Sequence, residues 1–384
     1  MKFKLGILAL LIFLSSCASH SRKDSYPVFP LAKNSDKSYG LEEMTGQALE
    51  YKMKGDYKKS YMLFKSILSR LEEKYEFLSQ IYLHFMNYLA IDTSLEEEYL
   101  DFLQQYIKGN TSSGRDLAMY FLMGAWEKRA LREKALKISD ELGFITQWYL
   151  LGPFKNEGRN GLDYTLPPEF EIDLGKTYTE SAYHPLRWRK INSSLGGPID
   201  LNNYLTPEKN SLAFLLTYIQ VPESGYYTVA LGTDDGYMLW INDRLINKND
   251  IYRKGYFDQE KFRVFLNKGL NRILLKLSQE YQNFELYFRI FPVDFQVVLT
   301  GSETFTPQDN SKQPAYPVAI KEKSFPDLEE KIPFLKEFFL GYYYFITGNF
   351  PDNKKMDAFW FQKALEKEKA SLFYYYAALA SSEN

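Results

Sequence analysis

Residues 234–241 read Asp-Asp-Gly-Tyr-Met-Leu-Trp-Ile, a polar turn that leads directly into an apolar strand. The aspartates of such a turn cap backbone amides, and the glycine accepts a positive φ. Short apolar runs separated by turn residues continue on both sides, from Trp148 to about Pro292. These runs are Leu212–Val221, Tyr226–Leu231, Tyr237–Ile241, Phe262–Leu266, Asn271–Leu277 and Phe284–Ile290. Their spacing predicts an antiparallel β-sandwich of two sheets.

Helical periodicity precedes and follows this strand-rich part. Before it, Met44, Ala48 and Tyr51 fall at spacings that place them on one helix face. Further amphipathic stretches follow at Glu76–Ile91, Leu95–Ile107, Arg115–Lys128 and Leu131–Leu142, and after the strands at Phe334–Thr347, Met356–Glu368 and Ala370–Ser381. The connections are short, so we expect antiparallel helical hairpins on both sides of the sandwich.

The first hairpin resembles a tetratricopeptide repeat. Ala48 and Ser60 take the two small positions of that family, Tyr51 the aromatic position and Phe64 the large apolar position. Successive hairpins begin near residues 44, 78 and 117, close to the roughly 34-residue period of the family, although the later two match poorly. Small residues let two helices approach, and large ones fill the groove between hairpins. An irregular helical bundle is the alternative.

Three motifs, in order, make the central part similar to the β-sandwich module of protective-antigen-type and galactose-binding-like domains. The motifs are Trp148–Phe154, Gly232–Asn242 and Lys268–Lys276. Lectin members of that broad family hold Ca²⁺, and through it sugar hydroxyls, with an adjacent Asp pair. The resemblance therefore implies a metal and sugar site at Asp234 and Asp235, since a hard cation prefers carboxylate oxygens.

A purely structural turn is the alternative interpretation of the Asp pair, because non-binding relatives keep the same two residues. The two tryptophans of the motifs also allow two interpretations. Trp148 and Trp240 could stack on a sugar, or they could fill the core of the sandwich, which is the more common use of tryptophan within a strand.

The start of the chain is typical of an exported protein. Lys2 and Lys4 precede the apolar run Leu5–Leu14. This run is too short for a spanning helix, which needs about 20 apolar residues, and therefore indicates a secretory signal. Leu14-Ser15-Ser16-Cys17 resembles the bacterial lipobox, which implies cleavage before Cys17 and acyl chains, such as palmitate, on that cysteine. An ordinary signal peptide that contains a cysteine is the alternative.

The lipobox resemblance places the protein in the bacterial cell envelope, where the acylated Cys17 would hold it at a membrane. By resemblance to lipoprotein sorting rules, Ala18 after the cysteine favours the outer membrane. The sequence thus predicts an α+β multidomain chain. Its parts are a signal peptide (1–16), a flexible tether (17–40), a tetratricopeptide-like helical domain (41–146), the lectin-like β-sandwich (147–298), a linker (299–333) and a C-terminal helical repeat (334–384).

Composition and motifs give little support for catalysis. The formal charge is −2, so nothing favours nucleic acid, and Cys17 is the single cysteine. His20 falls in the tether, His84 in a helical apolar pattern and His184 in a loop, so no two histidines are spaced as metal ligands. No Gly-rich phosphate loop or nucleophile motif is present. We expect no catalytic residue, no enzyme activity, and no cofactor other than the Ca²⁺ considered above.

The leading functional hypothesis is a membrane-anchored, non-enzymatic scaffold that binds a protein partner in the envelope. The helical hairpins would present a concave surface to that partner, and the sandwich would add a second recognition surface. One alternative is a surface lipoprotein that binds carbohydrate, with Ca²⁺ at Asp234 and Asp235. Another follows from a resemblance to the front part of longer repeat proteins that continue into a transglutaminase-like domain, in which case the activity would need another polypeptide.

Overall fold

The computed structural model describes most of the chain after residue 39. The described residues are 40–72, 74–91, 93–109, 113–179, 184–193, 196–207, 209–280, 283–299, 318–319, 326–348, 356–367 and 371–382. The predicted signal peptide, the lipidated Cys17 and nearly all of the tether lie outside these residues. None of the helices in the described part is long and apolar enough to span a bilayer.

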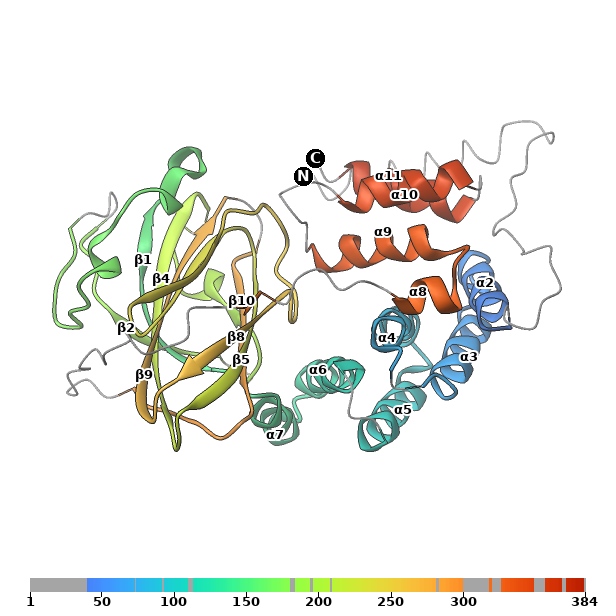
Figure 1. Cartoon of the computed structure of the whole chain (residues 1–384), viewed down its shortest axis with the longest axis horizontal. Coiled ribbons are helices and arrows are strands. Elements are labelled where there is room, and N and C mark those ends of the chain that lie inside the picture. The colour runs from blue at the N-terminus through green and yellow to red at the C-terminus, as the bar shows by residue number, and fades with distance from the viewer. Residues whose placement is uncertain are drawn as a thin grey trace.

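Helical hairpins form the first part of the described chain and follow one another along an arc (Figure 1). They comprise α2 (Gly40–Met53), α3 (Tyr57–Leu68), α4 (Glu76–Ala90), α5 (Glu96–Lys108), α6 (Ser113–Lys128) and α7 (Arg132–Leu142). The two small residues of the first hairpin lie at its crossing point, where Ser60 Oγ donates to Ala48 O at 2.7 Å. Asp56 begins α3 as its cap, with Oδ1 accepting from Lys59 N.

A sandwich of two antiparallel sheets follows, which confirms the predicted fold class. The strands are β1 (Gln147–Lys155), β2 (Arg189–Asn192), β3 (Ile199–Asp200), β4 (Ser211–Val221), β5 (Gly225–Thr233), β6 (Tyr237–Ile241), β7 (Arg244–Asn249), β8 (Glu260–Leu266), β9 (Gly269–Gln279), β10 (Glu285–Phe291), β11 (Gln296–Val297) and β12 (Val318–Ala319). One sheet has the order β2-β1-β4-β9-β6-β7, with β11 also paired to β4, and the other β12-β8-β5-β10-β3. Alternate apolar residues of both sheets meet in a shared core.

A second apolar core lies on the outer face of the larger sheet. Residues of the long excursion between β1 and β2, among them Leu162 and Tyr178, pack there against Phe214 and Trp240. Lys276 is also buried on this face, where its Nζ donates to Glu169 Oε1 at 2.7 Å. Both faces of the larger sheet are therefore covered.

The C-terminal helices return to the N-terminal hairpins and share one hydrophobic core with them. They are α8 (Pro326–Lys331), α9 (Lys336–Thr347), α10 (Met356–Lys367) and α11 (Ser371–Ser382), and Figure 1 shows α8 and α9 lying beside α4. Phe85 of α4 stacks on Tyr342 of α9 with ring centroids 4.3 Å apart. Glu42 of α2 accepts hydrogen bonds from the backbone N–H groups of Phe334 and Leu335, at the start of α9.

Several segments differ from the sequence prediction, among them the strands β1, β2, β3, β11 and β12, which were not predicted. The predicted linker, 299–333, contains α8, because a proline that interrupts a helix can also begin one: its missing N–H costs nothing in the first turn. The polar edge strand β7 was also not predicted; it follows β6 through a turn at Asn242 and Asp243. Both turn residues have positive φ, as a tight hairpin requires.

Candidate functional site

The Asp234–Asp235 turn links β5 to β6 at one end of the sandwich. Both side chains are buried, each with only 4% of its surface exposed. The positive φ of this turn was expected at Gly236, but it lies at Asp235, whose φ is +52°, a left-handed conformation that aspartate adopts more readily than most residues. The turn therefore directs two carboxylates inward, into the protein.

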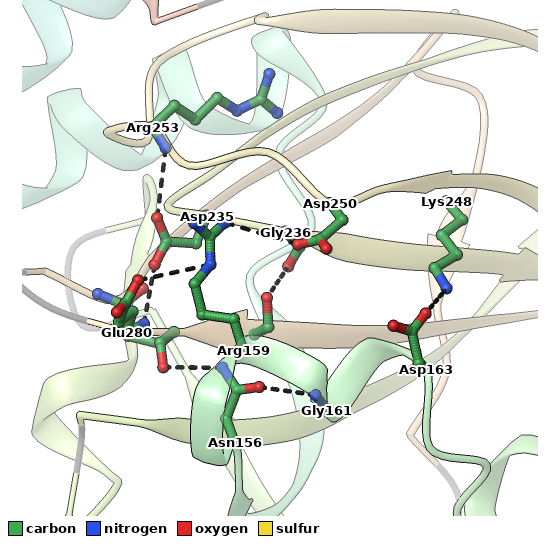
Figure 2. A network of polar contacts seen from close by, with 12 residues as sticks. Asn156, Arg159, Gly161, Asp163, Asp235, Gly236, Lys248, Asp250, Arg253 and Glu280 are labelled. Atoms are coloured by element: carbon green, nitrogen blue, oxygen red, sulfur yellow. Dashed lines mark hydrogen bonds and ion pairs between the residues drawn. The ribbon is translucent and has the colours of Figure 1, made fainter. Parts of the chain in front are cut away.

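All four carboxylate oxygens of the pair accept backbone hydrogen bonds. Asp234 accepts from Gly255 N at 2.8 Å and from Glu285 N at 2.9 Å. Asp235 accepts from Glu280 N at 2.9 Å and from Arg253 N at 3.3 Å (Figure 2). The pair thus ties together three segments that are distant in sequence.

Burial raises the pKa of both carboxyl groups, to about 7 for Asp234 and about 6 for Asp235. The backbone N–H groups act in the opposite direction, because they favour the ionised form, but their effect is smaller than the cost of removing the charge from water. The turn therefore titrates near neutral pH.

Two of the four donors belong to the segment Asp250–Gln259, which joins β7 to β8 and is called the connector loop below. The loop backbone lies directly on β5, since a Cβ added to Gly232 would come within 1.7 Å of Tyr256 O. Gln259 holds the end of the loop, accepting from Thr233 N at 3.0 Å and donating to Lys254 O at 2.8 Å. Only glycine fits at position 232 in this arrangement.

The other side of the connector loop enters the helical part of the protein. Phe257 is buried in the helical core and stacks on Tyr120 of α6 with centroids 4.7 Å apart. The Tyr256 hydroxyl lies 2.7 Å from His84 Nε2 on α4, and burial lowers the pKa of His84 to about 3. Gln259 Nε2 also donates to Thr347 O, at the end of α9.

An ion-pair cluster around Arg289 reinforces this junction. Arg289 lies on β10 and forms ion pairs with Asp258 of the connector loop at 2.5 Å and with Asp116 of α6 at 2.7 Å. Its Nη1 donates to Leu142 O at the end of α7. Gly143, which follows, approaches β10 so closely that a Cβ would lie 2.1 Å from Ile290 O. The sandwich and the helices are thus joined by buried contacts.

Charged side chains surround the outer side of the turn (Figure 2). Arg159 lies 3.5 Å from Glu280 and 3.7 Å from Asp250, and its guanidinium stacks over Tyr252. Within the described ranges, no group of three or more His, Cys, Asp or Glu side chains is arranged to hold a metal ion. The Ca²⁺ and sugar site at Asp234 and Asp235 stays a prediction.

The aromatic and histidine candidates lie elsewhere. Trp148 is fully buried between the sheets, where its Nε1 donates to Ile145 O, and it offers no exposed ring face. Trp240 is 8% exposed and belongs to the outer core of the larger sheet. His184 is exposed in the segment before β2. The structure therefore does not bring these residues to the Asp234–Asp235 turn as one group.

Comparisons with known proteins add little. No protein-family model and no curated protein matches the chain. Solved structures that it resembles include β-glucosidase from Kluyveromyces marxianus in complex with glucose, at 13% identity and a TM-score of 0.26, covering 37% of this chain and 16% of that one. Another is the GH31 α-xylosidase from Xanthomonas citri, at 14% identity and a TM-score of 0.22, covering 38% and 14%. The chain spans only a small part of these enzymes, and likeness at this level carries no functional argument.

Sequence reasoning missed the connector loop and Arg289. Within the predicted strand Phe284–Ile290, the alternate residues Phe284, Leu286, Phe288 and Ile290 are all buried in the sandwich core. The opposite face of this strand carries Tyr287 and Arg289, two large side chains. Side chains of this size indicate that a neighbouring element packs on that face. Nothing in the sequence indicated that this element is α6.

Proposed function

We propose that this protein is a lipid-anchored lipoprotein of the bacterial cell envelope and acts as a non-enzymatic scaffold for a protein partner. Cys17 would carry the anchor, and the helices and sandwich would form the scaffold. The observation that carries the proposal is the burial of Phe257, a sandwich residue, in the helical core. A partner bound to the helices would therefore be held in a fixed orientation relative to the sandwich.

The polar contacts also support a structural use of the sandwich. The carboxylates of Asp234 and Asp235 bind backbone amides, and Lys276 binds Glu169 within the outer core. Asp234, Asp235 and Lys276 are among the buried charged groups in which a catalytic role would be sought. Their hydrogen bonds hold segments of the chain together, which is what a rigid scaffold requires.

The helical surface that is available to a partner differs from the one in the sequence hypothesis. The sequence hypothesis placed the partner on the concave face of the hairpins, but the chain's own α9 packs on α4 through Phe85 and Tyr342. The connector loop covers part of α6 in the same way, through Phe257. A partner would accordingly bind an outward surface of the combined helices.

Cells that produce the chain can test the proposal in two steps. Labelling with a clickable fatty acid should mark wild type and not Cys17→Ser, and only wild type should sediment with membranes. Crosslinking in intact cells should then recover one envelope protein with wild type, and the same pair should be recovered when that protein is purified. Wild type without label, or without any reciprocal crosslink, contradicts the proposal.

A further inference from the structure

Three exposed tyrosines lie near one another where the N-terminal and C-terminal helices meet, and one of them, Tyr88, contacts a lysine. Tyr88 at the end of α4 is 60% exposed, Tyr57 at the start of α3 is 45% exposed and Tyr375 on α11 is 38% exposed. Tyr57 and Tyr375 each lie close enough to Tyr88 to raise the pKa of its hydroxyl, although burial contributes more. Lys52, in the last turn of α2, lies beside Tyr88. These four residues are called the tyrosine patch.

Lys52 is held by aromatic groups. Its Nζ lies 4.7 Å from the ring centroid of Tyr88 and 5.5 Å from that of Tyr376, and it donates to the Tyr376 hydroxyl at 3.2 Å. In the part of the chain that the structure describes, no carboxylate forms an ion pair with it. Burial lowers the pKa of Lys52 to about 8, so the ammonium is still charged at neutral pH but has lost much of its water.

The surroundings of the patch carry an excess of positive charge. Residues 52–59 include four lysines and one aspartate, in a chain whose formal charge is −2. Lys54 and Lys59 pair with Glu50 and Asp56, respectively. Among the described residues, Lys58 has no ion-pair partner, as Lys52 has none. The local charge is therefore complementary to an acidic ligand.

The patch also has a rigid base. Tyr376 packs edge-on against Tyr342 with centroids 5.4 Å apart, and Tyr342 stacks on Phe85. A surface fixed by the core loses little conformational entropy on binding, and tyrosine combines apolar area with a polar end at interfaces. Aromatic side chains of this kind accept extended, proline-containing peptides on their faces.

We propose that the tyrosine patch binds an acidic, extended peptide segment of the partner protein, with a carboxylate of the peptide on Lys52 and its apolar groups on the tyrosine rings. This inference rests on the proposed scaffold function and adds to it the binding surface and the chemistry of the partner. The carboxylate would supply the counter-ion that Lys52 lacks within the described chain. The rings of Tyr88 and Tyr376, which lie over the Lys52 ammonium, would shield that ion pair from water, which strengthens it.

Fluorescence polarisation with the purified full chain in detergent tests the inference directly. The probe is a fluorescein-labelled peptide of alternating glutamate and proline, and its control is the matched peptide of alternating lysine and proline. The acidic peptide should bind, the basic peptide should not, and binding should weaken as salt screens the charges. Equal binding of the two peptides would overturn the inference.

Variants then locate the site. Lys52→Gln and Tyr88→Ala should each weaken binding of the acidic peptide by about tenfold, whereas Lys52→Arg should retain it. Tyr164→Ala is the matched control, because Tyr164 is also 60% exposed but lies in the sandwich part, and it should leave the affinity unchanged. Thermal unfolding of each variant shows whether the fold is preserved. Loss of affinity in none of the patch variants, or in Tyr164→Ala equally, contradicts the assignment.

The crosslinking experiment separates this inference from the scaffold function. If wild type crosslinks a partner and Tyr88→Ala crosslinks it equally well, the patch is wrong and the scaffold proposal stands. If wild type crosslinks no partner, the scaffold proposal fails first. A neutral oligosaccharide that displaces the acidic peptide from the patch would also overturn the assignment of an acidic peptide as its ligand.

Discussion

The charged groups of the Asp234–Asp235 turn and of the tyrosine patch differ in their partners and in their exposure to solvent. In the turn, each carboxylate oxygen accepts a backbone N–H, and both side chains are almost fully buried. In the patch, the Lys52 ammonium meets aromatic rings and one hydroxyl at a surface with exposed tyrosines. The charged pair that is most conspicuous in the sequence holds the fold together, whereas an inconspicuous helical lysine is left available to a partner.

Removing one carboxylate from the turn should have the largest effect on stability. Asp234→Ala leaves the buried N–H groups of Gly255 and Glu285 without acceptors, so we expect the free energy of unfolding to fall by about 2–4 kcal/mol. Urea denaturation followed by circular dichroism measures this change. The helices should loosen together with the sandwich, because the connector loop enters the helical core.

A matched substitution distinguishes a buried carboxylate from an ordinary one. Asp163 is 67% exposed and pairs with Lys248 at 2.6 Å on the surface. Asp163→Ala should change the free energy of unfolding by less than about 0.5 kcal/mol. Equal losses for Asp234→Ala and Asp163→Ala would mean that the turn does not hold the connector loop.

The second-largest effect that we expect is a pH dependence of the unfolding free energy that is caused by Asp235. The folded-state pKa of Asp235 is raised from 3.8 to about 6, so its contribution to stability is fully present below pH 3.8 and is lost as the pH rises through about 6. Asp235→Asn removes this titration. The difference in unfolding free energy between wild type and Asp235→Asn should therefore change between pH 4 and pH 7, in the direction that makes wild type relatively weaker at pH 7.

The contribution of Lys52 to stability should depend on pH with the opposite sign and in a more alkaline range. The folded-state pKa of Lys52 is lowered from 10.5 to about 8, so its contribution is present above pH 10.5 and is lost as the pH falls through about 8. Comparing wild type with Lys52→Met should isolate a gain in wild-type stability from pH 8 to pH 10. A flat difference over that range would mean that Lys52 is as well solvated as an ordinary surface lysine.

The elements that could be predicted from the sequence are those that local patterns determine. The predicted helix Glu76–Ile91 corresponds to α4, and the predicted strand Leu212–Val221 corresponds to β4. Periodicity and turn residues determine such elements over a few residues, so one sequence contains the signal. The turn at Asp234–Asp235 was predicted for the same reason.

Contacts between distant segments could not be predicted in the same way. The stacking of Phe85 on Tyr342 joins residues that are separated by the whole sandwich, and either ring could have packed within its own hairpin. The stacking of Phe257 on Tyr120 could not be predicted either. A phenylalanine in a polar loop indicates that another element covers its ring, but it does not identify that element. The tyrosine patch was missed because its residues come from four different helices.

Calcium should change the stability of the protein least of all, and the measurement concerns both the turn and the tyrosine patch. A cation at Asp234 and Asp235 would have to compete with four backbone N–H groups for carboxylate oxygens, and losing those bonds would release the connector loop. We therefore expect the melting temperature of wild type to change by less than about 1 °C in millimolar Ca²⁺ or in chelator, because a ligand that does not bind the folded state cannot stabilise it. A rise of several degrees that is specific to Ca²⁺ over Mg²⁺, and absent in Asp235→Asn, would instead support a metal-dependent glycan site. The sandwich would then carry the recognition that we assign to the helices, because the turn would bind a ligand in addition to fixing the connector loop.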